Sequence, residues 1–216
     1  MEKLGLQVAI LAVCTSVSFH DYGKSINYHN DSSGFLLVKK TKGIELYEKW
    51  YEITNQEVAR EVKVVYTINA TIESAAALIE SESLATQWNK SSSMYKIIPT
   101  DENSWISYIQ YDLPWPMANQ DCVLQYSVSN VTDNHIIIDF KSVEHEIFPT
   151  SNNVIRIADV KGKWVFRETN IGTLVEYSIT TMPSPTLPRW VTDPLVRNNL
   201  IDTMDEFRTI LETSKN

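Results

Sequence analysis

The hydrophobic pattern is clearest near the C-terminus, where apolar residues recur every three or four positions within 188–212. They are Val196, Leu200, Met204, Phe207 and Leu211, with charged and amide residues between them. This period predicts an amphipathic helix that covers apolar surface, and it is the only long helix that the pattern offers. We expect it to begin at Asp193 and Pro194, because Asp can cap free N–H groups and Pro at the first position wastes no donor.

Most of the chain before that helix has the pattern of β-strands. Residues 58–68 alternate, which predicts a strand with one buried face. One face carries Val58, Val62, Val64, Tyr66 and Ile68, and the other carries Glu61, Lys63 and Thr67. Arg60 and Lys63 are alternatives for an inward polar group there, depending on strand register. The other predicted strands are 35–40, 44–51, 94–99, 104–111, 123–128, 135–140 and a last hairpin of 155–169 and 172–182 with Asn170 at its tip.

A predicted helical segment separates the first strands from the later ones. Residues 71–88 have a helical apolar face, Thr71 is a suitable cap, and a split into two short helices is expected near Ser81 or Ser83. The order of elements indicates an α+β class: a strongly curved antiparallel β-sheet wrapped around a long C-terminal α-helix. No Pro- or Gly-rich linker interrupts it, so we expect one domain over about 35–213.

The N-terminal residues have a different pattern. Residues 4–13 form an apolar run that is too short to span a bilayer but fits the core of a secretory signal, with cleavage after Ser18. We therefore expect a signal peptide over 1–18, a flexible lead-in over 19–34, and an exported protein, periplasmic or secreted. Lipid attachment at Cys14 and an ordinary N-terminal helix of a cytoplasmic protein are the alternatives.

Charge and chemistry narrow the function. The formal net charge is -8, which argues against nucleic-acid binding because phosphate contacts need clustered Lys and Arg. The four histidines lack a metal-ligand spacing, and the six glycines form no phosphate cradle. Cys122 opens a strand and is expected in the core rather than as a nucleophile. We expect no metal, no cofactor and no catalysis.

The chain is rich in rings, with six Trp, ten Tyr and six Phe. A curved sheet with a helix across its mouth often encloses space for a ligand. The alternative is that these rings fill the core. Ile147 and Phe148 lie in the long connection after Phe140 and call for a partner surface, either the core or a ligand.

One segment favours a ligand space over a core filled by rings. Residues 111–123, which include Pro114-Trp115-Pro116, resemble the Pro-Trp-Pro…Arg-Asp-aromatic-Val segment of START domains, the lipid-transfer family related to the steroidogenic acute regulatory protein. Gln120 stands where that family usually has Arg, Asn89 replaces its usual Asp, and its initial long helix is absent or reduced. Further segments match the family in the same order, and they are 43–47, 78–89, 154–164, 172–177 and 187–191.

The resemblance implies a helix-grip fold with a hydrophobic tunnel that binds a lipid, a sterol or another hydrophobic small molecule. It also implies that the loop after Phe140 gates the tunnel beside the terminal helix. Non-catalytic binding, with transfer of the ligand, is the leading hypothesis, and we expect a monomer that makes transient contact with a membrane. An enzyme of the wider superfamily, a cyclase or hydrolase, is the second hypothesis, and a domain with a filled core is the third.

Candidate ligand contacts follow from this reading. Arg156 is the candidate polar anchor, with a surface strand residue in a salt bridge as the alternative. Phe207 and Leu211 are expected to pack as core, whereas the part of the helix from Trp190 to Met204 is expected to face the ligand. The candidate walls and gate are Trp105, Ile109, Ile138, Ile147, Phe148, Met182, Trp190, Leu200 and Met204.

Overall fold

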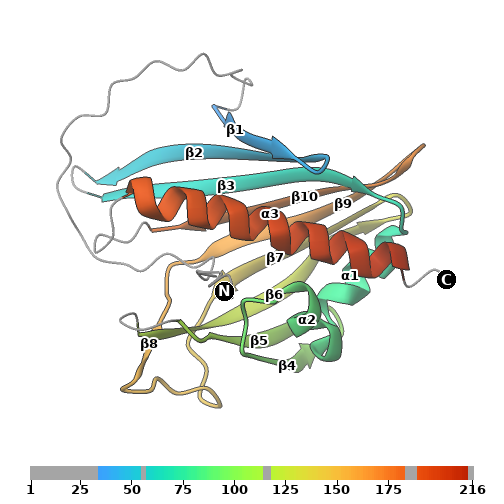
Figure 1. The fold of residues 1–216 in the computed structure, drawn as a ribbon. Helices are drawn as coiled ribbons and strands as arrows, with labels where there is room; N and C mark the ends of the chain where they lie inside the picture. The colour runs from blue at the N-terminus through green and yellow to red at the C-terminus, as the bar shows by residue number, and fades with distance from the viewer. Residues whose placement is uncertain (1–33, 55–56, 114–117, 183–188, 214–216) are drawn as a thin grey trace, which may run out of the picture.

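The computed structural model describes residues 34–54, 57–113, 118–182 and 189–213. These residues form ten strands in one sheet and three helices (Figure 1). The strands are β1 (Leu36–Thr41), β2 (Ile44–Thr54), β3 (Glu57–Ile68), β4 (Met94–Asp101), β5 (Ser104–Tyr111), β6 (Asn119–Thr132), β7 (His135–Ser142), β8 (Val154–Arg156), β9 (Lys161–Thr169) and β10 (Gly172–Thr181). The helices are α1 (Ile72–Ile79), α2 (Glu82–Trp88) and α3 (Arg189–Thr213).

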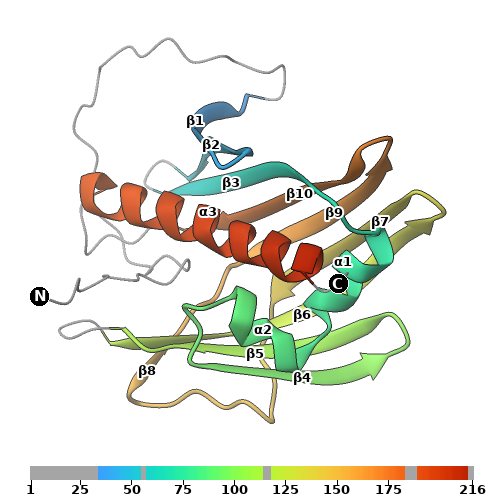
Figure 2. The same cartoon turned by 45° about the vertical axis from the view of Figure 1, so that its right-hand side comes forward.

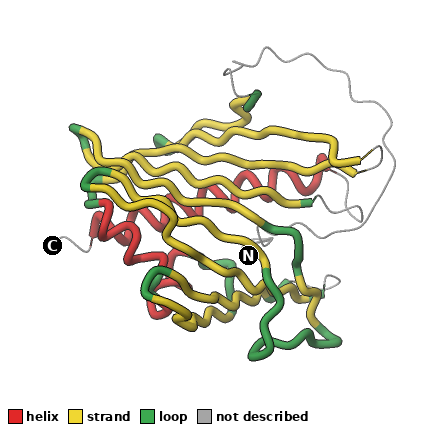
Figure 3. The backbone as a smooth tube through the Cα atoms, turned by 180° about the vertical axis from the view of Figure 1, so that it is seen from behind, coloured by secondary structure: helices red, strands yellow, loops and turns green. Residues whose placement is uncertain are grey.

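Nine strands pair antiparallel in the order β1-β2-β3-β10-β9-β7-β6-β5-β4, and the short strand β8 pairs in parallel with β6. The last hairpin, β9–β10, is inserted between β3 and β7, so it joins the N-terminal strands β1–β3 to the strands β7, β6, β5 and β4. Helix α3 lies across the concave face, and α1 and α2 close one end (Figures 1 and 2). Figure 3 shows the outer face, with α3 behind the sheet. The predicted fold, a curved antiparallel sheet around a long C-terminal helix, is confirmed.

The strand pattern also settles which polar residue of β3 faces inward. Arg60 shares the buried face with Val62 and Val64 and is 6% exposed. Lys63 lies on the opposite face, where its amine is 4.2 Å from the centre of the Phe35 ring. The side-chain period of two in a strand therefore selects Arg60 of the two alternatives.

Local signals for the short helices are confirmed. The Thr71 hydroxyl accepts a hydrogen bond from the Ser74 amide at 3.2 Å, which caps α1. The split falls at Ser81, the residue before α2. Capping satisfies amide donors that a helix start leaves free, which is why Thr is a good marker of this boundary.

Two predicted boundaries were wrong. The strand expected over 155–169 is interrupted: β8 pairs in parallel with β6, and the chain turns before β9 pairs with β7. Helix α3 begins at Arg189, before Asp193, and Pro194 lies inside it. A proline inside a helix loses one backbone hydrogen bond and crowds the carbonyl four residues earlier. The carboxylate of Asp193 pairs with Arg60 and Arg197 instead of starting the helix.

The core lies between α3 and the sheet. Phe207 is fully buried, and its ring centre is 5.1 Å from that of Trp164 and 5.5 Å from that of Trp88. Leu211 is 6% exposed, so the C-terminal part of α3 packs as core, as expected. Cys122 is fully buried in the same cluster, and burial raises the pKa of its thiol, which confirms a packing position.

The expected signal segment, 1–18, and the lead-in apart from Gly34 lie outside the described residues. Among the described helices, none is both long enough and apolar enough to cross a bilayer.

Candidate functional site

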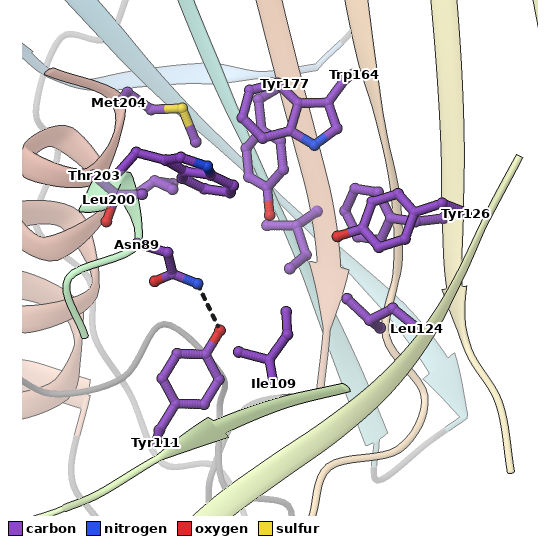
Figure 4. A pocket seen from close by; sticks show the side chains of 13 residues that line it. Asn89, Ile109, Tyr111, Leu124, Tyr126, Trp164, Tyr177, Leu200, Thr203 and Met204 are labelled. Carbon is purple, nitrogen blue, oxygen red and sulfur yellow. Dashed lines mark hydrogen bonds between the residues drawn. The ribbon is translucent and has the colours of Figure 1, made fainter. Parts of the chain in front are cut away.

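A cavity of about 50 Å³ lies between α3 and the concave face of the sheet. Residues from α2, β5, β6, β7, β9, β10 and α3 line it (Figure 4). Leu200, Thr203 and Met204 form the wall on α3, and Ile109 and Leu124 belong to the wall on the sheet. The cavity thus lies where the terminal helix crosses the sheet.

Aromatic rings and a few uncharged polar groups give the cavity its chemical character. In Figure 4 the hydroxyl groups of Tyr126 and Tyr177 point toward its interior, and that of Tyr111 faces Asn89. The Asn89 amide Nδ2 donates to the Tyr111 hydroxyl at 3.3 Å. Burial raises the pKa of each of the three phenols, so all of them stay protonated at neutral pH.

Four charged side chains, three of them buried and Arg197 partly exposed, fix the N-terminal half of α3 to β2 and β3. We call Glu48, Arg60, Asp193 and Arg197 the Glu48 cluster. Arg197 donates to both carboxylate oxygens of Glu48, at 2.8 and 2.9 Å, and Arg60 pairs with Glu48 and, at 3.2 Å, with Asp193. The Arg60 guanidinium also lies 5.4 Å from the centre of the Trp50 ring.

The Glu48 cluster balances two acids against two arginines. Glu48 is 2% exposed, and its burial by itself would raise its pKa. The Arg197 hydrogen bonds and the charges of Arg60 and Arg197 outweigh that effect and lower the pKa of Glu48 below its ordinary value. Glu48 is therefore ionised at neutral pH, and the pairs hold α3 against the sheet.

Three of the ten predicted contact residues line the cavity: Ile109, Leu200 and Met204. Trp105 lies one layer behind, stacked on Tyr126 with ring centres 5.1 Å apart. Ile138 is fully buried in the core without lining the cavity.

Met182, half-buried just beyond the end of β10, does not line the cavity. Trp190 belongs to the first turn of α3, but its side chain lies outside the described residues.

Of the two roles considered for Arg156, the structure shows the second: it is a strand residue in a salt bridge. Its guanidinium donates to both oxygens of Asp121, at 2.7 and 3.0 Å, and to the Phe148 carbonyl at 3.0 Å. It does not line the cavity. These bonds join β8 to β6 and fix the loop that follows β7.

The loop between β7 and β8 does not lie beside α3. Ile147 is 57% exposed, and the Phe148 ring stacks on Tyr108 at 4.8 Å. Tyr108 is on the opposite face of β5 from Ile109, because side chains alternate along a strand. In Figures 1 and 2 this loop projects beyond β8, away from α3.

The polar residues of the cavity, Asn89 and Tyr111, were not among the predicted ligand contacts. Asn89 and Tyr111 lie in segments that match the family, but the pattern gave no reason to place them together. Trp88 is the last residue of the helical stretch expected over 71–88, and its ring lines the cavity. The position of Tyr111 could have been inferred from the strand period, because Tyr111 is two residues after Ile109 and therefore lies on the same inward face of β5.

The described lining residues include no Asp, Glu, His, Lys or Arg. Within the described part of the chain, no three His, Cys, Asp or Glu side chains come together in a metal-binding arrangement. The described lining therefore offers apolar surface and uncharged hydrogen-bonding groups.

A curved sheet that grips a C-terminal helix around an aromatic cavity defines the class of protein. The model of the START domain family matches residues 35–216, and the chain belongs to that family. The resemblance read from the sequence segments is thus confirmed.

Related proteins agree with this assignment. An uncharacterized protein of Pseudomonas aeruginosa is 24% identical over 177 residues, 82% of this chain and 86% of that protein. The solved STAR-related lipid transfer protein of Xanthomonas axonopodis is similar with a TM-score of 0.71 and 21% identity, over 82% of this chain and 98% of that one. Human StAR-related lipid transfer protein 5 gives a TM-score of 0.72 and 14% identity, over 86% and 90%. At these identities the two structures establish the fold.

Proposed function

We propose that this START domain binds a lipid or another hydrophobic small molecule between α3 and the sheet, without converting it chemically. The observation that carries the proposal is the cavity itself, an aromatic space at the place where α3 crosses the concave face. Two proteins of similar fold are named lipid transfer proteins, which supports the same ligand class. Burial of apolar ligand surface supplies the affinity, at about 25 cal/mol per Å² before ordering costs.

Ligand binding requires the cavity to enlarge. Its volume of about 50 Å³ has room for a few water molecules. Sites for drug-sized ligands have volumes of roughly 300–1,000 Å³. Because the sheet strands are tied by continuous ladders, the element that can yield is α3, whose Leu200, Thr203 and Met204 form one wall. We infer that the ligand enters as the N-terminal half of α3 moves away from the sheet.

Transfer between membranes and export are further parts of the proposal. A protein that encloses a lipid without altering it can release it at a second membrane. Fluorescent-lipid transfer between donor and acceptor vesicles tests the first part, with tight binding but no transfer as the contrary result. N-terminal sequencing of the protein from its native host tests export, and a chain that still carries residues 1–18 would contradict it.

Catalysis on a hydrophobic substrate is the competing function. General acid–base catalysis works best when a catalytic group has a pKa near the working pH. The titratable groups among the described lining residues are Tyr111, Tyr126 and Tyr177, and burial moves the pKa of each away from neutrality. This chemistry favours binding over turnover.

The test of binding is direct. The full chain is purified from its native host, extracted, and the extract is analysed by mass spectrometry for a co-purifying hydrophobic compound near a one-to-one ratio. Leu200→Trp adds a large ring to the α3 wall and should abolish that compound. Thr209→Trp, at an exposed position on the same helix, is the matched control and should retain it.

The outcome that contradicts the proposal is equally plain. A folded wild-type protein that yields no compound and binds no added sterol, fatty acid or alkyl probe would overturn it. Circular dichroism on both variants separates a blocked cavity from loss of the fold.

A further inference from the structure

Basic side chains gather on the outer face of the sheet, where β7 and β9 pair. Lys161, Lys163 and Arg167 alternate along β9 and point away from α3, because Trp164 between them is buried on the inner face. Lys141 on β7 lies directly opposite Lys161 in the antiparallel register. All of these basic residues are exposed, and Figure 3 shows their strands from outside, with α3 behind the sheet. We call Lys141, Lys161, Lys163 and Arg167 the outer basic patch.

The other described lysine and arginine side chains are engaged within the protein. Eight pair with an acid, Lys39 bonds to Asn198, and Lys49 and Lys63 lie over the Phe35 ring. The eight are Lys40, Lys42, Arg60, Lys90, Lys96, Arg156, Arg197 and Arg208. The outer basic patch differs from them, because none of its side chains has a hydrogen bond or ion pair within the described part of the chain.

The arrangement of the outer basic patch is unfavourable for the protein by itself. Lys141 and Lys161 repel each other, because side chains directly opposite in neighbouring strands have Cβ atoms about 5 Å apart. Asp139 on β7 and Glu176 on β10 face the same side and offset part of the charge. Four cations and two acids still leave this area positive, although the whole chain has a formal net charge of -8. A local excess of positive charge on an acidic protein indicates an anionic partner.

The residue types in the patch favour a lipid surface as that partner. All but one are lysines, and the lysine ammonium is a hydrated point charge on a flexible stem, whereas arginine is the better residue for bidentate recognition of one phosphate. The net charge of the chain argues against nucleic acid. Each Lys or Arg close to an anionic bilayer strengthens binding roughly fivefold, so a patch of this size gives a weak and reversible contact.

We propose that the outer basic patch docks this protein on anionic lipid bilayers. The proposal rests on the proposed function in one respect, that a protein which exchanges lipid has to meet a membrane. The patch and α3 lie on opposite faces of the sheet (Figure 3), so docking leaves α3 uncovered. The contact therefore holds the protein at a bilayer without hindering the movement of α3 that ligand entry requires.

Flotation of the full chain with vesicles tests the proposal. One set of vesicles contains equal parts of phosphatidylglycerol and phosphatidylcholine, and the other contains phosphatidylcholine alone. At low ionic strength the wild-type protein should float with the anionic vesicles and stay behind with the neutral ones. Salt at about 1 M should release it, because the Debye length then falls to about 3 Å.

Two triple variants with the same change in net charge locate the contact. The patch variant combines Lys141→Gln, Lys161→Gln and Lys163→Gln. The control combines Lys40→Gln, Lys90→Gln and Lys96→Gln, at exposed lysines whose surface ion pairs contribute little to stability. The patch variant should lose about a hundredfold in partitioning to anionic vesicles, and the control less than about threefold.

Lysine acetylation of the wild-type protein identifies the docked face independently of any variant. The protein is treated with acetic anhydride with and without anionic vesicles, and mass spectrometry measures the label at each lysine. Lys161 and Lys163 should be protected by the vesicles, whereas Lys90 should react equally in both samples. Circular dichroism verifies that both triple variants are folded.

The outcomes separate docking from ligand binding. Equal losses in the two triple variants, or equal flotation with neutral vesicles, would overturn the proposal. So would a wild-type protein that stays behind with both vesicle sets: binding of polyglutamate instead would assign the patch to an acidic protein, and self-association at low salt would assign it to a second copy. Binding of a fluorescent fatty acid without vesicles should be the same in both variants, so its absence from the wild-type protein contradicts only the proposed function.

Discussion

Glu48→Gln is the sharpest test of how α3 is held. Glu48 is the centre of the Glu48 cluster: it accepts two hydrogen bonds from Arg197 on α3 and a further one from Arg60 on β3. Glutamine has nearly the same shape, so the change removes a charge and leaves packing almost intact. It removes the carboxylate that Arg60 and Arg197 share, and both arginines keep their pairs with Asp193.

The size of the effect follows from burial. Glu48 is 2% exposed and Arg60 is 6% exposed, so solvent screens this pair very little. Removing one partner of a buried ion pair typically costs about 3–5 kcal/mol, because the other charge stays buried and unpaired. With Asp193 still present, we expect about 3 kcal/mol of lost unfolding free energy at pH 7. Glu52→Gln, an exposed change on the same strand, should cost less than about 0.5 kcal/mol.

The pH dependence has a definite sign. The folded-state pKa of Glu48 lies below its ordinary value of 4.5. Its stabilisation is therefore complete above 4.5 and is lost as the pH falls from there through the folded-state pKa. Glu48→Gln lacks this titration, and every other carboxyl group is common to both proteins. The stability gap between wild type and variant should therefore narrow as the pH falls from 7 to about 3.

Urea unfolding followed by far-UV circular dichroism measures the gap at each pH. A loss below about 1 kcal/mol at pH 7 would show that the Glu48 cluster contributes little net stability. A gap that stays constant down to about pH 3 would refute the assignment of the pH effect to Glu48.

Three further changes test the packing. Phe207→Ala should cost about 3–5 kcal/mol in urea unfolding, because the ring is fully buried among other rings and leaves a void; a cost under about 1 kcal/mol would contradict that. Gly162→Ala would place a methyl carbon 2.1 Å from the Ser178 carbonyl oxygen and should lower the unfolding free energy by about 2 kcal/mol or more; an unchanged thermal midpoint would be the contrary result. Arg156→Met should free the loop of residues 143–153 from β8 and speed its cleavage in limited proteolysis, and unchanged cleavage would show that the Asp121 pair does not fix it.

Much of the fold was predictable from local signals. Alternation along β3 and the three-to-four spacing along α3 correspond directly to buried faces, because both follow from backbone geometry. Thr71 and Asn170 marked a helix start and a hairpin tip through capping and turn chemistry. These signals depend on neighbours in sequence, so a sequence reading can find them.

The wrong boundaries depend on distant partners. Residues 155–169 have strand composition throughout, and the break between β8 and β9 arises because β8 pairs with β6 instead of continuing along β7. Asp193 looked like a cap because it precedes Pro194, but its carboxylate faces Arg60, which is 133 positions away in the chain. No local pattern shows such a contact.

The sequence predicted several apolar residues of the cavity wall but not its polar residues. Met204 and Leu200 follow from the helical stripe, and Ile109 from its strand. The pairing of Asn89 with Tyr111 needs both the end of α2 and the inward register of β5, which sequence alone leaves open.

The two halves of α3 differ in what binds them, and this difference decides where the cavity can open. The C-terminal half is held by the buried rings around Phe207, with exposed ion pairs such as Lys42–Asp205 at its surface. The N-terminal half is held by the Glu48 cluster, and its next turns carry Leu200 and Met204 into the cavity. The hydrogen bonds of the Glu48 cluster depend on distance and angle and are exchanged for bonds to water once solvent enters, whereas the buried rings lose a large apolar contact area when they separate. A ligand that needs space should therefore displace the N-terminal half and leave the Phe207 end in place. Hydrogen exchange on the loaded and empty protein then has a definite expectation: ligand-dependent change in α3 before Met204, and uniform protection after Phe207.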